Sequence, residues 1–284
     1  MTPSPAQTLL GTLFPSSFSE RPGRRPAQLA VEGILSTLVS TAVPVALGIE
    51  AAGFVSLFLV AAALSDRVRQ LLDENRRDIW ERKVGGWRAN RTTATGILAL
   101  FAGVFAGYTL VGYSLDEARI AAAFGFALRA AALGGENLLQ RDFGNFASIF
   151  GHNISVLLVI ALLSFVYRAY GTMLALAWNA SVWALVITLL AMRAATASGL
   201  PAFASVALAV TALAPHLLLE GLAYITASLA FLFASKGLTT YPGDDPRLRS
   251  VLAASAVLTV AACAALAAAA AVEVVLAPLA LSLL

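Results

Sequence analysis

The chain has 284 residues, of which 59% are hydrophobic and only 12% are charged, and its formal net charge is +3. Soluble domains carry roughly 25% charged residues, so this composition excludes a soluble globular protein. Two histidines and a single cysteine, Cys263, argue against a disulfide framework and against a zinc site built from cysteines. We therefore predict an all-α, polytopic membrane protein with about six to seven transmembrane helices in contact with the lipid bilayer. We predict no cofactor and no metal site. We also predict no nucleic-acid partner, because the basic residues cluster in loops, where they set orientation in the bilayer.

Residues 1–28 are polar and rich in proline, without an apolar run long enough for the core of a signal peptide, which predicts a disordered cytoplasmic tail. Residues 31–64 are apolar apart from Glu32 and Glu50. A single straight helix of that length would measure about 50 Å, whereas the hydrocarbon core is roughly 30 Å thick. Two short helices that meet between Pro44 and Glu50 fit better, and one tilted span with an interfacial lead-in is the alternative.

A charged segment follows at residues 65–91, where basic and acidic side chains alternate. Opposite charges three or four residues apart predict a solvated helix that extends from the preceding span and stops at Gly85 and Gly86. Because this segment holds more basic residues than any other, we place the N-terminus and residues 66–91 in the cytoplasm. Residues 29–91 thus form an apolar hairpin plus a charged cytoplasmic helix, and residues 92–284 form the membrane domain.

The first half of the membrane domain begins with a clean span at residues 92–115, in which Gly103 and Gly107 are expected to allow close helix packing. Residues 116–142 combine mixed charge with an apolar stripe, which predicts an amphipathic helix on the outer surface. The next apolar block predicts two spans joined by a short turn at Arg168 and Gly171, with bounds 149–167 and 170–192.

The second half of the membrane domain contains residues 202–235, which are too long for one helix across the bilayer. Proline is tolerated in the first turn of a helix and disfavoured within one, so Pro215 predicts a broken or re-entrant segment near 202–215. A full helix at 215–235 would then run inward. A last span at 250–272 leads into an apolar tail that contains Pro278.

Polar side chains inside these apolar blocks are the candidate site. His216 and Glu220 are four residues apart and so share one face of a helix. Under the predicted topology they would meet side chains from three other spans in one outward-facing cluster: His152, Asn153, Asn179 and Glu273. Such groups mark function more often in a membrane than in a soluble core, although an internal hydrogen bond that fixes helix packing remains open. A metal bound by His152, His216, Glu220 and Glu273 is a weaker alternative.

The string Pro215-His216-Leu217-Leu218-Leu219-Glu220 resembles the PHG-x-x-E signature of the stage II sporulation protein M family. Further pieces follow in the family's order: Asn153 to Val156, Gly171 to Ala180, Asp245-Pro246-Arg247, and Ala271-Val272-Glu273 with Pro278. The resemblance covers roughly residues 90–284. It departs from the family at His152, Leu217 and Ala180, where the family has asparagine, glycine and glycine.

The resemblance implies a membrane component of a complex that acts on peptidoglycan and anchors partner enzymes. We therefore expect a non-enzymatic scaffold or assembly component in a bacterial or archaeal cytoplasmic membrane, which recruits membrane or envelope proteins. Assembly of the chain into a homo-oligomer is a possible further partnership. A small transporter or lipid-handling permease is the alternative, because broken helices lined by histidine and glutamate are features that transporters use. An intramembrane hydrolase that uses His216, Glu220 and His152 is a second alternative.

Overall fold

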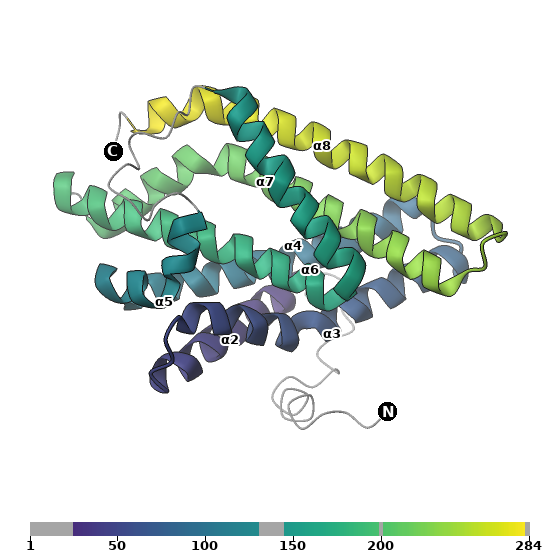
Figure 1. Ribbon diagram of the computed structural model, residues 1–284, viewed down its shortest axis with the longest axis horizontal. Coiled ribbons are helices and arrows are strands. Elements are labelled where there is room, and N and C mark those ends of the chain that lie inside the picture. The colour runs from purple at the N-terminus through teal and green to yellow at the C-terminus, as the bar shows by residue number, and fades with distance from the viewer. Residues whose placement is uncertain (1–24, 131–144, 199–200, 282–284) are drawn as a thin grey trace.

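The computed structural model describes residues 25–130, 145–198 and 201–281, which form helices and contain no strand. The helices are α2 (Arg25–Ala46), α3 (Ala52–Trp80), α4 (Gly86–Ser114), α5 (Glu117–Ala130), α6 (Phe146–Ser198), α7 (Ala202–Thr240) and α8 (Pro246–Leu281). In Figure 1 the long helices run along one bundle, with α2 and α8 at opposite edges. The predicted all-α class is confirmed. The predicted tail, however, ends early, because α2 already begins at Arg25.

Five described segments are long and apolar enough to cross a membrane: Arg25–Ala46, Gly86–Ser114, Phe146–Arg193, Ala214–Thr240 and Pro246–Leu276. The third contains a sharp bend, described below, so it supplies two arms. These segments make the chain a polytopic helical membrane protein.

Helices α2 and α3 form an antiparallel hairpin about the turn at residues 47–51, which confirms the predicted pair of helices meeting between Pro44 and Glu50. Arg67 of α3 donates to the Glu32 carboxylate of α2 at 2.7 Å. About two helical turns further from the hairpin turn, Arg25 of α2 donates to the Glu74 carboxylate of α3. Within each pair, the two residues lie equally far from the turn along the sequence, one on each side of it. The two helices therefore run in register. Helix α3 ends at Trp80 rather than at Gly85, so the predicted charged helix is a few residues too long.

Helix α4 packs against α2 through glycines on both helices. A Cβ atom at Gly103 would lie 2.1 Å from the Ala30 carbonyl oxygen, and one at Gly33 would lie 2.8 Å from the Leu100 carbonyl oxygen. Side chains at these positions would force the backbones apart. Gly103 therefore has the packing role predicted for it, and its partner is helix α2 of the N-terminal hairpin.

Helix α5 covers one end of the bundle. Its Ile120 and Phe124 are fully buried, and the Phe124 ring lies at Gly53 near the start of α3. Part of the predicted apolar stripe therefore faces inward. The rest of the predicted amphipathic segment, residues 131–142, lies outside the described residues.

Helix α6 is two arms that fold back on each other at Arg168, whose φ of 53° and ψ of −130° are not helical. Gly171 makes the close approach possible, since a Cβ there would lie 1.9 Å from the Leu163 carbonyl oxygen. Across the bend the Thr172 hydroxyl donates to the Ser164 Oγ at 3.1 Å. The two predicted spans and their turn at Arg168 are therefore confirmed.

Helix α7 corrects one prediction. It is helical from Ala202 through Pro215 to Thr240, so the expected break or re-entrant turn near 202–215 is wrong. One proline removes a single backbone hydrogen bond, and a helix can bend around it without reversing. Helix α8 likewise continues through Glu273 and Pro278 to Leu281, so the predicted end of the span at 272 is wrong.

The loop between α7 and α8 is fixed by Asp245, which caps α8 just before Pro246. The Asp245 carboxylate accepts from the Arg247 backbone N–H at 2.8 Å and from its guanidinium at 2.6 Å. These bonds hold the pKa of the Asp245 carboxyl below its ordinary value. An aspartate cap followed by proline in the first turn explains locally why the chain re-enters a helix here.

Ion pairs between helices show which loops lie at the same end of the bundle. Lys236 of α7 donates to Asp73 of α3, so the α7–α8 loop lies at the same end as the Arg25–Glu74 pair; we call this the charged end. At the opposite end Arg193 of α6 donates to Glu117 of α5. Segments predicted to share a side of the membrane thus share an end. Which end faces the cytoplasm remains a prediction from the distribution of basic residues.

Candidate functional site

The predicted polar residues of α7 lie in the interior of the bundle. His216 and Glu220 are buried, and one turn further Tyr224 is buried beside the Glu220 carboxylate. Glu273 of α8 is also only 8% exposed and lies close enough to Tyr224 to interact with its hydroxyl electrostatically. Two carboxylates from neighbouring helices therefore converge on one phenol inside an apolar bundle.

The first arm of α6 borders the same region. Tyr224 packs in an apolar cluster with Leu157 and Ile160 of that arm, and its ring stacks on Trp183 with centroids 6.3 Å apart. Asn153 is buried in the first arm of α6, and its side-chain nitrogen has no hydrogen-bond partner among the described residues. We define the buried polar cluster as Asn153, His216, Glu220, Tyr224 and Glu273.

Two predicted members have other surroundings. Asn179 is buried, but its amide donates to the Ala175 carbonyl at 2.9 Å, which is a bond within its own helix. His152 is exposed on the outer surface of the bundle, whereas its neighbour Asn153 points inward. The alternative of a metal site used His152 as a ligand, and the structure places His152 away from the other proposed ligands. Within the described ranges no three His, Cys, Asp or Glu side chains are grouped so that they could hold a metal ion.

Sequence reasoning missed Tyr224 and the small polar residues near it. Ser228 of α7 and Ser255 of α8 are buried, and neither hydroxyl has a hydrogen-bond partner in the part of the chain that the structure describes. A signal was present in the sequence, because His216, Glu220, Tyr224 and Ser228 recur every fourth residue and so form one stripe along α7. The stripe faces α6 and α8, which are the helices that α7 contacts most.

Burial of these groups has a physical cost that the arrangement partly relieves. An ionised carboxylate inside a bilayer is expensive, and such residues face the interior of a bundle and associate with other polar groups. A phenol beside two carboxyl groups can donate to one of them, and a protonated carboxyl can donate in turn. The cluster is chemically able to hold and pass a proton or to bind a cationic group.

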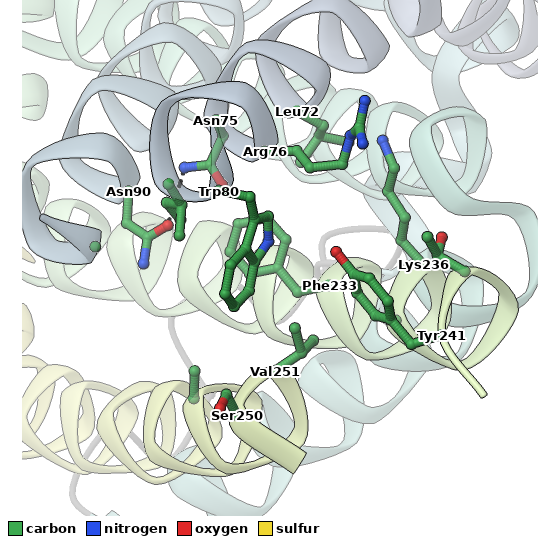
Figure 2. A pocket seen from close by; sticks show the side chains of 15 residues that line it. Leu72, Asn75, Arg76, Trp80, Asn90, Phe233, Lys236, Tyr241, Ser250 and Val251 are labelled. Atoms are coloured by element: carbon green, nitrogen blue, oxygen red, sulfur yellow. Dashed lines mark hydrogen bonds between the residues drawn. The ribbon is translucent and has the colours of Figure 1, made fainter. Parts of the chain in front are cut away.

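A second site, missed entirely from the sequence, is a pocket of about 240 Å³ at the charged end. It lies between α3, α4, α7 and α8 (Figure 2), and we call it the end pocket. The rings of Trp80 and Tyr241 meet edge to face with centroids 6.4 Å apart, and Asn75 donates to Asn90 at 2.9 Å beside them. Arg76 and Lys236 also line it, and their charged ends point the same way in Figure 2.

No known protein family, no curated protein and no solved structure matches this chain. The resemblance to the stage II sporulation protein M family therefore rests on its short motifs and their order.

Proposed function

We propose that this protein is an integral membrane scaffold of the cell envelope that recruits partner proteins to its charged end. The observation that carries the proposal is the second half of α3. It is a charged helix fixed to the membrane bundle by ion pairs to both α2 and α7, through Glu32 and Lys236.

The fixation matters because a docking surface works best when it is ordered before the partner arrives. The outer face of α3 carries exposed side chains of both signs, including Arg69, Asp73 and Arg77. Charges at the rim of an interface steer association and select partners by complementarity. The family resemblance, with its implied role in anchoring envelope enzymes, supports the same proposal.

A photo-crosslinking amino acid at Arg77 tests this proposal in cells. Arg77 is exposed on α3, and Val257, 68% exposed on α8, is the control on an apolar face. We expect a discrete protein adduct from position 77 and none from position 257, detected as a shifted band and identified by mass spectrometry. Charge reversal at Arg69, two turns away, should weaken the adduct. Adducts of equal intensity from both positions, or none from position 77, would contradict the scaffold role.

A second candidate function, a small transporter or permease, is favoured by the buried polar cluster. Two carboxylates, a histidine and a tyrosine between α6, α7 and α8 are the groups expected along an ion or proton pathway. A pathway of this kind must admit water at some stage of the transport cycle.

Cysteine accessibility tests for that water, because the chain has a single native cysteine, Cys263, that can first be replaced by alanine. A cysteine at Ser228, which is fully buried on the α7 stripe, should react with a small hydrophilic thiol reagent if a wet pathway exists. A cysteine at Leu229, buried on the same turn in the apolar core, is the matched control. If neither cysteine reacted with the reagent, the buried polar cluster would have only a structural role, and the transporter candidate would be excluded.

A further inference from the structure

The end pocket lies where charged sequence gives way to apolar sequence on three helices. Helix α7 carries no charged residue between Glu220 and Lys236, and α8 carries none between Arg249 and Glu273. Helix α4 enters its apolar span after Arg91. The pocket lining includes residues from both sides of this boundary, so the pocket is placed at the depth of the lipid headgroups.

Aromatic residues mark the same depth independently. Trp87, next to the pocket residue Gly86, is 84% exposed. Tryptophan is usually buried in soluble proteins, whereas exposed tryptophan is typical of a membrane interface. Trp80 and Tyr241 line the pocket itself. Tryptophan and tyrosine gather at the headgroup level because their rings are apolar at one end and polar at the other.

The lining has two chemical parts. The walls are mostly hydrocarbon and aromatic, contributed by residues such as Leu72, Ile79 and Phe233, whereas the cations Arg76 and Lys236 belong to the side that faces the charged end. The lining of the end pocket includes no acidic residue. This arrangement fits a molecule with an anionic group attached to an apolar body.

We propose that the end pocket binds an anionic phospholipid, with the phosphate at Arg76 and Lys236 and the glycerol and upper acyl region against Trp80 and Phe233. The proposal goes beyond the scaffold function and does not depend on it. It requires only that the charged end lie at a membrane surface, whichever side that is.

Both cations have acidic neighbours that a phosphate would have to replace. Lys236 donates to Asp73, and Arg76 lies 3.9 Å from Glu81, with Asp73 and Glu81 both more than half exposed. Ion pairs of such exposure are weak because water screens them. A phosphate held over an apolar pocket is less screened, so an exchange of partners favours the lipid.

Binding is testable with full-length protein in detergent, titrated with dihexanoyl phosphatidylglycerol below its micelle concentration and followed by tryptophan fluorescence. Dihexanoyl phosphatidylcholine and inorganic phosphate form the comparison arms. We expect saturable binding of phosphatidylglycerol and at least about tenfold weaker binding of the other two. Inorganic phosphate binding as tightly would identify a free-phosphate site and overturn the lipid assignment. Phosphatidylcholine binding as tightly would overturn the role of the cations.

Variants locate the binding. Arg76→Gln combined with Lys236→Gln should weaken phosphatidylglycerol binding by about fivefold for each charge removed. The matched control is Arg69→Gln with Arg82→Gln, which removes one charge from α3 and one from the turn after it, both outside the pocket lining, and should leave affinity unchanged. Equal loss in both double variants would reduce the effect to general surface charge and overturn the proposal.

A second pair of variants keeps the test valid if the charge change disturbs folding. Ala254→Leu fills the pocket from α8 without changing charge, and Ala253→Leu adds the same bulk to an exposed neighbouring position outside the lining. We expect the first to abolish phosphatidylglycerol binding and the second to preserve it. Unchanged binding in Ala254→Leu would show that the lipid sits elsewhere.

Discussion

At the scale of single residues, glycines set how closely α2 and α4 pack. Gly103→Ala places a methyl group 2.1 Å from the Ala30 carbonyl oxygen, which is backbone and cannot move alone. We expect Gly103→Ala to destabilise the protein by about 1–3 kcal/mol, the usual cost of overpacking. Thermal unfolding in detergent measures it.

Gly151→Ala is the control for this prediction, because Gly151 lies in α6 with nothing within 4 Å of the added Cβ. Alanine has a higher helix propensity than glycine, so this change should be neutral or stabilising by up to about 1 kcal/mol. If Gly103→Ala melted no lower than Gly151→Ala, the close α2–α4 contact would not exist as described.

A buried hydroxyl pair gives a second prediction at this scale. The Ser56 Oγ and Tyr108 hydroxyl are 2.9 Å apart between α3 and α4, and both side chains are fully buried. Ser56→Ala and Tyr108→Phe should each destabilise, and the double variant should cost less than their sum, with a coupling of about 0.5–2 kcal/mol. A double-mutant cycle of unfolding free energies measures the coupling. Simple additivity would mean that the two hydroxyls do not interact.

At the scale of elements, the α2–α3 hairpin depends on its ion pairs to different extents. The Arg67 and Glu32 side chains are only 18% and 14% exposed, so Glu32→Lys should destabilise the protein by about 2–4 kcal/mol by leaving two buried positive charges. Adding Arg67→Glu should restore much of the loss by exchanging the charges. The measurement is again thermal unfolding in detergent.

The contrasting pair on the same helix is Arg69 with Asp66, whose side chains are 56% and 40% exposed. Asp66→Asn should cost no more than about 1 kcal/mol, because exposed ion pairs are screened. No rescue of Glu32→Lys by Arg67→Glu would show that the hairpin register differs from the one described.

At the scale of the whole molecule, the two ends of the bundle should face opposite sides of the membrane. In a Cys263→Ala background, Asp244→Cys probes the α7–α8 loop at the charged end and Ile49→Cys probes the exposed α2–α3 turn. We expect an impermeant maleimide to label Ile49→Cys from outside intact cells and Asp244→Cys only in inverted vesicles. Labelling of both from one side would refute the topology.

Much of the fold was readable because hydropathy and charge act locally. The hairpin between Pro44 and Glu50, the bend at Arg168 and the grouping of segments by side followed from span length and basic residues. The break at Pro215 did not follow, because whether a proline bends a helix or ends it depends on the helices packed around it. The bundle holds α7 helical on both sides of that residue.

The sequence by itself determined that this is a helical membrane protein and that His216, Glu220 and Glu273 would be its costly polar residues, because lipid penalises charge wherever it occurs. Only the tertiary structure decided that Tyr224 joins them, that His152 does not, and that α3, α4, α7 and α8 enclose the end pocket. The reason is that helix rotation and pairing are set by side-chain packing between segments far apart in the chain, which no local pattern encodes.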